Sequence, residues 1–123
     1  YLEEGDLAFL EEKNREMERA ITEDRLEDLG ELNRDFHLRI YRCLPYPRLY
    51  KMICDLWEAF ERSQSVFSYV PERASASVKE HSLIIQALRA RDPVQAEELI
   101  RRQKERTLEA LRRYSGQDKV QKD

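Results

Sequence analysis

Turn-forming residues and long apolar runs are scarce in this sequence, and their scarcity excludes several fold classes. Only 3 glycines and 4 prolines occur among 123 residues, which is too little turn chemistry for an all-β sandwich. No run rich in Val, Ile and Phe could form a buried parallel sheet, so an α/β nucleotide-binding fold is excluded as well. No stretch approaches the ~18 consecutive apolar residues of a membrane span, and no signal-peptide pattern opens the chain. We therefore predict an all-α protein without a membrane partner.

The sequence also contains few cysteines and has a small net charge. The two cysteines, Cys43 and Cys54, lie in consecutive segments with helical patterns. Without a secretion signal we expect free thiols and a cytoplasmic location. The 22 basic and 25 acidic residues give a net charge of −3, which argues against a chain that binds nucleic acid through its own charge. The arginines between positions 101 and 113 alternate with glutamates, which is typical of a solvated helix face.

Apolar residues recur every three or four positions over five segments, with charged residues between them, as in amphipathic helices. We predict helices over about 5–20, 23–43, 47 to between 66 and 71, 75–89 and 92–114. Pro45 and Pro47 break the chain between the second and third helices. The prediction is an antiparallel helical bundle over residues 1–115, followed by a disordered tail over 116–123. The helical pattern is present from the first residues, and we expect the chain to be part of a longer protein.

Four polar residues interrupt the apolar stripes of these helices: Asn33, His37, His81 and Gln103. Asn33 and His37 are four residues apart and therefore share one helix face. His81 and Gln103 belong to the stripes of two later helices. Polar residues at core positions are informative because most polar side chains stay at the surface. Since facing helices of a bundle assemble ligand and metal sites in this way, the spacing predicts a polar pocket inside the bundle.

Residue chemistry alone leaves two interpretations of this pocket open. Buried histidines are often structural and hydrogen-bonded to a carbonyl or hydroxyl group. Two neutral imidazoles are also good ligands for zinc, nickel or manganese, but Asn33 and Gln103 add only neutral oxygens, and no carboxylate or thiolate offsets the charge of the ion. No nucleophile elbow and no phosphate-binding glycine loop is present in the sequence, and we expect no enzyme.

Two segments resemble a known family. Asn33-Arg34-Asp35-Phe36-His37 is similar to the D/N-x-x-F-H segment of the FCD domain, the C-terminal effector-binding domain of FadR-type regulators in the GntR superfamily. A second segment resembles the E-H-x-x-I-x-x-A-L-x-x-x-D-x-x-x-A stretch of that domain, through Glu80, His81, Ile84, Ala87, Leu88, Asp92 and Ala96. The resemblance covers about Leu7 to Tyr114.

The resemblance implies a dimeric, all-helical bundle, usually of six or seven helices, with an internal pocket. Many members hold a divalent metal there through one Asp and three His, and the metal helps to bind a small carboxylate. Carried over by position, the metal ligands here are Asn33, His37, His81 and Gln103, so this sequence departs from the pattern at two of four places. Members without the metal bind their effector directly.

We therefore predict the ligand-sensing domain of a bacterial transcription regulator, which binds a small carboxylate effector with or without one divalent metal (zinc, nickel or manganese). The expected ligand-binding residues are Asn33, His37, Tyr41, Arg62, His81 and Gln103. The resemblance also implies a homodimer, and a winged helix-turn-helix domain that binds DNA and, with the first helices of the FCD domain, precedes Tyr1. Two alternatives remain, a metal-free helical adaptor and a small metal-dependent hydrolase that uses His37 and His81.

Overall fold

Helices account for the regular structure of the described residues, and no strand occurs among them. The computed structural model describes the backbone of residues 2–61, 67 and 70–122 and the side chains of residues 2–59, 67 and 70–114. The elements are α1 (Glu4–Thr22), a 3-10 turn (Leu26–Asp28), α2 (Leu29–Arg42), α3 (Pro47–Glu61), α5 (Glu72–Arg89) and α6 (Pro93–Lys122). The predicted all-α fold of about five helices is confirmed.

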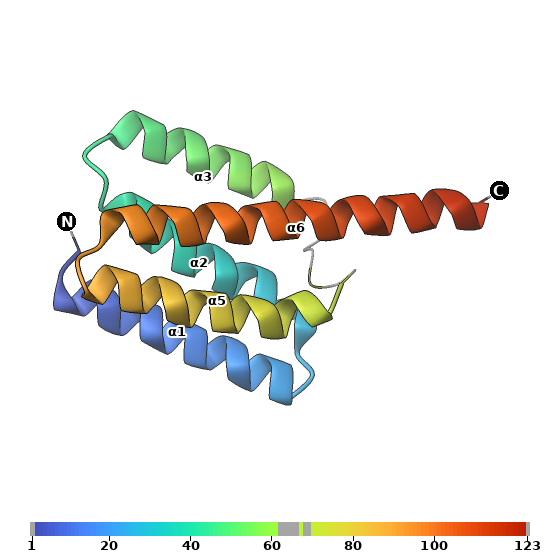
Figure 1. Ribbon diagram of the computed structural model, residues 1–123, viewed down its shortest axis with the longest axis horizontal. Helices are drawn as coiled ribbons and strands as arrows, with labels where there is room; N and C mark the ends of the chain where they lie inside the picture. The colour runs from blue at the N-terminus through green and yellow to red at the C-terminus, as the bar shows by residue number, and fades with distance from the viewer. Residues whose placement is uncertain (1, 62–66, 68–69, 123) are drawn as a thin grey trace.

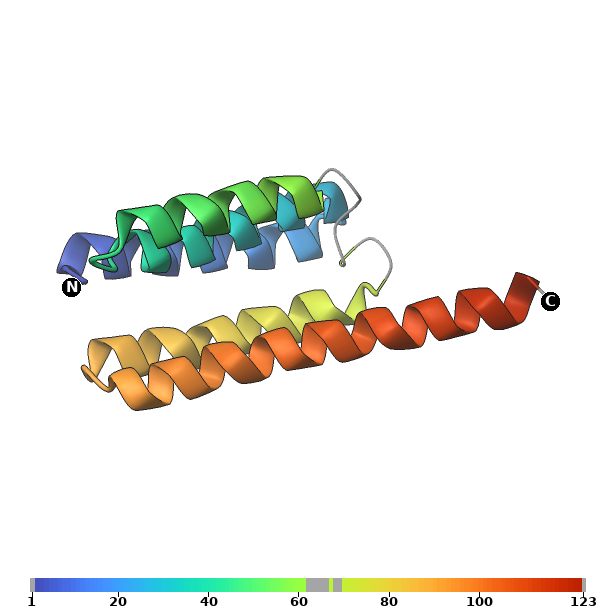
Figure 2. The same cartoon turned by 90° about the horizontal axis from the view of Figure 1, so that it is seen from above.

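The helices are arranged in two layers, as Figure 1 and Figure 2 show. One layer contains α1, α2 and α3, and the other contains α5 and α6. Within the layers α1 contacts α2, α2 contacts α3 and α5 contacts α6, while α1 also packs against α5 and so joins the layers. The last turns of α6 extend past the other helices in both views. None of the described helices is both long and apolar enough to cross a membrane.

The second helix begins later than its periodicity predicts. The expected start is near residue 23, but the chain turns sharply after α1. Asp24 takes a positive φ of 57°, a conformation that aspartate tolerates better than most residues, and the Arg25 N–H donates to the Ala20 carbonyl at 2.7 Å. A 3-10 turn follows, and regular α-helix begins at Leu29. The predicted start is therefore wrong, because apolar spacing continues across a change of chain direction.

The remaining boundaries differ less. α5 begins at Glu72, directly after Pro71, and not at 75–77 as its apolar pattern predicts. α6 begins at Pro93, where the Asp92 carboxylate accepts a hydrogen bond from the Gln95 N–H at 3.1 Å and caps the helix. Its backbone is helical to Lys122, through most of the segment for which the sequence predicts a disordered tail. The predicted end of the third helix, between 66 and 71, falls largely outside the described residues.

Two apolar clusters of described residues form the core. The first contains Leu7, Leu10, Phe36, Ile40, Ile84 and Ile85, and the second contains Met17, Ala20, Leu29, Phe67 and Ala74. Buried polar residues lie between the clusters, namely Asn14 on α1 and both Ser77 and His81 on α5. These buried polar residues form a layer between the two apolar clusters, which we call the polar level. Apolar packing on both sides fixes its position.

Candidate functional site

Two buried histidines form the centre of the polar level. His37 of α2 and His81 of α5 have only 2% and 0% of their surface exposed, and their Nε2 atoms lie 3.3 Å apart. The Phe36 ring stacks on the His81 imidazole at a centroid distance of 3.9 Å and an interplanar angle of 14°. Packing therefore fixes both the position and the plane of the His81 ring.

Asn14 of α1 determines which nitrogen of His81 carries the proton. Its Nδ2 donates to the Val78 carbonyl at 3.1 Å and to the Ser82 hydroxyl at 3.2 Å. Its Oδ1 therefore faces His81 Nδ1, which lies 3.2 Å away. Because an amide oxygen only accepts hydrogen bonds, this network assigns the proton to His81 Nδ1. The lone pair of His81 Nε2 consequently points toward His37.

His37 has the opposite tautomer. Because His81 Nε2 carries a lone pair, His37 Nε2 carries a proton and donates it across the 3.3 Å contact. The other ring nitrogen, His37 Nδ1, is buried and has no hydrogen-bond partner among the described residues. An unpaired buried nitrogen costs free energy, so this atom is suited to accept a hydrogen bond from a bound molecule.

Both imidazoles are neutral at pH 7. Burial lowers the pKa of His37 well below its usual 6.5, and the positive charge of Lys104 lowers it further. Burial also lowers the pKa of His81 to about 3, with Lys104 and Arg73 adding to the effect. Removal from water penalises the charged form of an imidazole, so the pair offers neutral nitrogens to any ligand.

Two amide side chains close to the histidine pair also contain unpaired atoms. Asn33 Oδ1 on α2 and both Nε2 and Oε1 of Gln103 on α6 are buried without a partner in the described part of the chain. Native proteins leave few buried polar atoms unpaired, so these atoms indicate a place where a ligand or ordered water completes the hydrogen bonds. We call Asn33, His37 and Gln103 the polar cluster.

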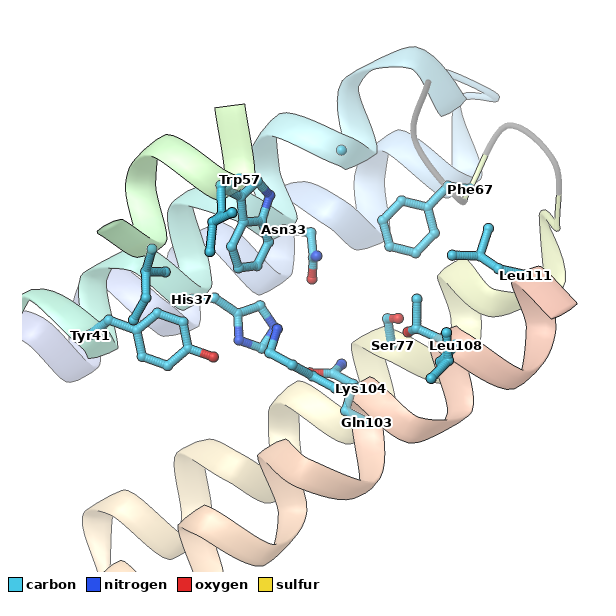
Figure 3. A pocket seen from close by; sticks show the side chains of 14 residues that line it. Asn33, His37, Tyr41, Trp57, Phe67, Ser77, Gln103, Lys104, Leu108 and Leu111 are labelled. Atoms are coloured by element: carbon cyan, nitrogen blue, oxygen red, sulfur yellow. The ribbon is translucent and has the colours of Figure 1, made fainter. Parts of the chain in front are cut away.

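The polar cluster faces a cleft of about 510 Å³ between the two layers. Figure 3 shows the cluster beside Lys104, with the apolar side chains of Leu108 and Leu111 further along the cleft. The lining consists of Gly30, Asn33, His37, Tyr41, Ile53, Leu56, Trp57, Phe67, Ser77, Gln103, Lys104, Thr107, Leu108 and Leu111. The walls are therefore mainly apolar, and the polar groups converge at one place.

Lys104 is the one charged residue in this lining, as far as the structure describes it. Its Nζ lies 4.6 Å from the centroid of the Trp57 ring and 5.9 Å from that of Tyr41, so the ammonium lies close to the electron-rich faces of two rings. No carboxylate of a described residue pairs with it. Partial loss of water lowers the pKa of Lys104 from its usual 10.5, while the residue remains accessible to solvent.

A buried ion pair lies beside two hydroxyl groups of the cleft. Arg73 donates to both carboxylate oxygens of Glu80, at 2.8 and 3.2 Å. The same guanidinium also donates to the hydroxyls of Ser77 at 3.5 Å and Thr107 at 3.3 Å. Because each hydroxyl oxygen accepts from Arg73, its own proton is available to a ligand in the cleft.

The structure brings together most of the residues that the sequence predicts for the site. The cleft lining includes Asn33, His37, Tyr41 and Gln103. Burial raises the pKa of Tyr41 to about 12, so its hydroxyl stays protonated. His81 is not part of the lining and contacts His37 as a hydrogen-bond partner. Arg62 lies outside the described residues.

Asn14 and Lys104 are among the site residues that the sequence analysis misses, as are Ser77 and Thr107. Asn14 follows Leu10 by four positions and precedes Met17 by three, so it lies on the apolar stripe of α1 and meets the criterion that selects the other polar residues. Lys104 carries no such signal, because it belongs to a run of charged residues. Only the tertiary contacts of its ammonium distinguish it.

A comparison with known protein families identifies the fold. The model of the FCD domain matches residues 2–114. The chain belongs to the FCD family. No curated protein and no solved structure gives a significant match. An FCD domain is the ligand-binding, regulatory part of GntR-type transcription regulators and is not typically catalytic. The predicted family is confirmed, and the cleft is the natural candidate for the effector site of this FCD domain.

FCD domains are often associated with a metal, but the donor set of this one does not fit a divalent ion. The 3.3 Å between the two Nε2 atoms does match the ~3.3 Å between neighbouring nitrogens of a tetrahedral zinc site. However, the described residues contain no group of three or more His, Cys, Asp or Glu side chains that could hold a metal. The other two predicted ligands, Asn33 and Gln103, are neutral, and Lys104 adds a positive charge. No anion therefore offsets the charge of the ion.

Proposed function

We propose that this FCD domain senses a small carboxylate that binds in the cleft between α2, α3 and α6. The supporting observation is that the polar cluster of Asn33, His37 and Gln103 contains buried atoms without partners at the wall of a mainly apolar cleft. Small-molecule sites combine apolar walls with a few convergent polar groups at volumes of ~300–1,000 Å³. The volume of about 510 Å³ lies within this range.

The hydrogen-bonding groups of the cleft suit a carboxylate. A carboxylate only accepts hydrogen bonds, and Gln103 Nε2 and the hydroxyls of Ser77 and Thr107 are donors. The unpaired acceptors, Asn33 Oδ1 and His37 Nδ1, suit a hydroxyl or other donor on the same ligand. A hydroxycarboxylate would therefore use both sets of groups.

We propose that occupancy of the cleft is transmitted to a winged helix-turn-helix domain of the same regulator. A molecule in the cleft touches both layers, because His37 belongs to the layer of α1–α3 and Gln103 to the layer of α5 and α6. It therefore favours those arrangements of the layers in which it makes its contacts best. In a dimer, such a change alters the relative placement of two attached DNA-binding domains.

We also propose that this domain forms a homodimer through α3. Leu49 and Met52 of α3 are 45% and 61% exposed and lie three residues apart on one face of the helix. Large exposed apolar residues that adjoin each other are typical of interaction surfaces. A second copy of the chain is the partner that the FCD family implies.

Thermal unfolding with a panel of carboxylates tests the proposed effector site. The panel is acetate, hexanoate, benzoate, lactate, malate and citrate, each at millimolar concentration with and without added zinc. A ligand at 100 times its Kd stabilises the folded domain by about 2.7 kcal/mol, so we expect at least one member to raise the Tm by several degrees. If no member raises the Tm, the proposal is contradicted and the helical adaptor becomes the better interpretation.

A matched pair of variants locates the binding. Leu108 and Leu83 are both 48% exposed, but only Leu108 lines the cleft. We expect Leu108→Trp to abolish the ligand-induced rise in Tm by filling the cleft, and Leu83→Trp to retain it. An equal rise in both variants would place the ligand elsewhere on the domain.

A further inference from the structure

Building on the proposed carboxylate site, we infer that Lys104 supplies the positive charge that binds the effector's carboxylate directly, in place of a metal ion. Two observations support this inference. The cleft contains an ammonium group without a carboxylate partner among the described residues. The predicted metal ligands Asn33, His37, His81 and Gln103 include no carboxylate and no thiolate.

The ammonium of Lys104 has capacity for an anionic partner. Its contacts are the rings of Trp57 and Tyr41, with Nζ at 4.6 and 5.9 Å from their centroids. Aromatic faces attract a cation but do not neutralise its charge, and an ammonium has three N–H donors. An entering carboxylate therefore gains an ionic hydrogen bond to this ammonium at the wall of the cleft.

The charge of Lys104 also acts on His37. The ammonium of Lys104 lies 4.6 Å from the centroid of the Trp57 ring, and that ring lies 5.6 Å from the His37 ring, centroid to centroid, so the ammonium opposes a positive charge on His37. A divalent ion between the two Nε2 atoms would meet the same opposition with twice the charge. The field that disfavours a cation at this place favours an anion.

Gln103 provides a second donor next to the ammonium. It precedes Lys104 on α6, both residues line the cleft, and Gln103 Nε2 has no partner among the described residues. One carboxylate oxygen can accept from Lys104 and the other from Gln103. A primary amide of the same shape would keep the apolar contacts of the ligand and lose the ion pair. The comparison of an acid with its amide therefore isolates the contribution of charge.

Calorimetric titration of the domain in EDTA with matched acids and amides tests the role of Lys104. The probes are hexanoate with hexanamide and benzoate with benzamide. We expect the wild type to bind at least one acid about tenfold or more tightly than its amide, as an added ionic hydrogen bond predicts. Lys104→Met should lose this preference and leave the affinity for the amide within about twofold, and Lys104→Arg should retain part of the preference.

Lys79→Met is the matched control. Lys79 is an exposed lysine of α5 that does not line the cleft, so its removal changes the net charge of the domain by the same amount. We expect this variant to retain the acid preference of the wild type. If Lys104→Met fails to fold, Lys104→Gln serves as the test variant.

The outcomes separate the two proposals. An acid preference that persists without the lysine, or acid binding that occurs only after zinc is added, overturns the role of Lys104 and leaves the carboxylate site standing. Failure of the wild type to bind any carboxylate of the panel, with EDTA or with zinc, contradicts the carboxylate site itself.

Zinc titration of a redesigned cleft gives a second readout that needs no effector. The triple variant Asn33→Asp/Gln103→His/Lys104→Met adds an anion and an imidazole and removes the ammonium. We expect it to bind zinc at least about tenfold more tightly than the wild type, because a carboxylate now offsets the charge of the ion. If the wild type binds zinc equally well, the charge argument for Lys104 is wrong.

Discussion

Burial gives individual residues of this domain properties that they lack in water. The pKa of His81 falls to about 3 and the pKa of Tyr41 rises to about 12, and both shifts favour the neutral form because the charged form has lost its hydration. The polar level therefore makes its hydrogen bonds with neutral groups. Lys104 alone brings a charge to the described lining of the cleft.

The two histidines make stability depend on pH. An unfolded histidine binds a proton near pH 6.5, while the pKa values of folded His37 and His81 lie well below that. Their contribution to the free energy of unfolding is therefore fully present above about pH 6.5. It is lost as the pH drops, because protons bind preferentially to the unfolded chain. Between about pH 7 and pH 5, each histidine should lower the free energy of unfolding by about 2 kcal/mol. Urea unfolding at the two pH values measures this loss.

A single-histidine variant provides the control for this measurement. His37→Gln should show about half of the pH-dependent loss, whatever its stability at pH 7. The lowered carboxyl pKa values of Glu12 and Glu98 affect stability only at lower pH, below about 4.5. Equal unfolding free energies at pH 7 and pH 5 in the wild type would show that the histidines titrate normally.

At the scale of the elements, α5 and α6 are joined by a charged network as well as by apolar contacts. Glu80 accepts from the buried Arg73 of its own helix and from Arg106 of α6 at 3.0 Å. Arg73 in turn donates to Thr107 of α6. Because Arg73 is only 8% exposed, the loss of Glu80 leaves its buried charge without a carboxylate partner among the described residues.

Glu80→Leu should therefore lower the free energy of unfolding by about 3–5 kcal/mol, as for other buried ion pairs that lose one partner. Glu109→Leu is the matched control, since Glu109 pairs with Arg113 at the surface of α6 and exposed pairs contribute about 1 kcal/mol or less. Urea unfolding compares the two. The double variant Arg73→Met/Glu80→Leu should recover most of the loss. Equal losses in the two single variants would contradict the buried pair.

Periodicity predicts the existence of these elements better than their limits. The five helices follow from apolar residues at intervals of three and four, and Asp92-Pro93 marks the start of α6 correctly. The start of α2 is wrong because residues on both sides of the turn at Asp24 are apolar at helical spacing. A pattern of side chains does not record a change in the direction of the backbone.

At the scale of the whole molecule, α3 leaves an apolar face uncovered in the single chain. Its principal packing partner is α2, and both Leu49 and Met52 remain exposed. If this face forms the proposed dimer, the domain in solution should have twice the 14.8 kDa mass of the chain. Leu49→Glu/Met52→Glu should shift the population to monomer, because burying two carboxylates in an apolar interface is costly.

Light scattering coupled to size-exclusion chromatography measures these masses. Val94→Glu is the control, because Val94 is an apolar residue of α6 that is 76% exposed, more than either Leu49 or Met52. We expect Val94→Glu to remain dimeric. A wild-type domain that is already monomeric, or a double variant that stays dimeric, would contradict the assignment of α3 to the interface.

The sequence by itself determined the fold class, the family and the three residues of the polar cluster. Apolar spacing and scarce turn residues require helices, and Asn33, His37 and Gln103 are visible because each occupies a position where the pattern demands an apolar side chain. Local periodicity carries this information, so one chain is enough to recover it. Asn14 is also a polar residue at an apolar position of α1, so the same pattern predicts it as a buried polar residue.

Only the tertiary structure decided how these residues act. It placed His81 behind His37, with its tautomer set by an asparagine 67 positions away in the sequence, and it brought the ammonium of Lys104 over Trp57 of a different layer. Charges, tautomers and unpaired atoms depend on which helices pack together and on which of their residues face each other. No local sequence pattern encodes these contacts. The proposal that the cleft binds an anion through Lys104 and not through a metal ion rests on these contacts.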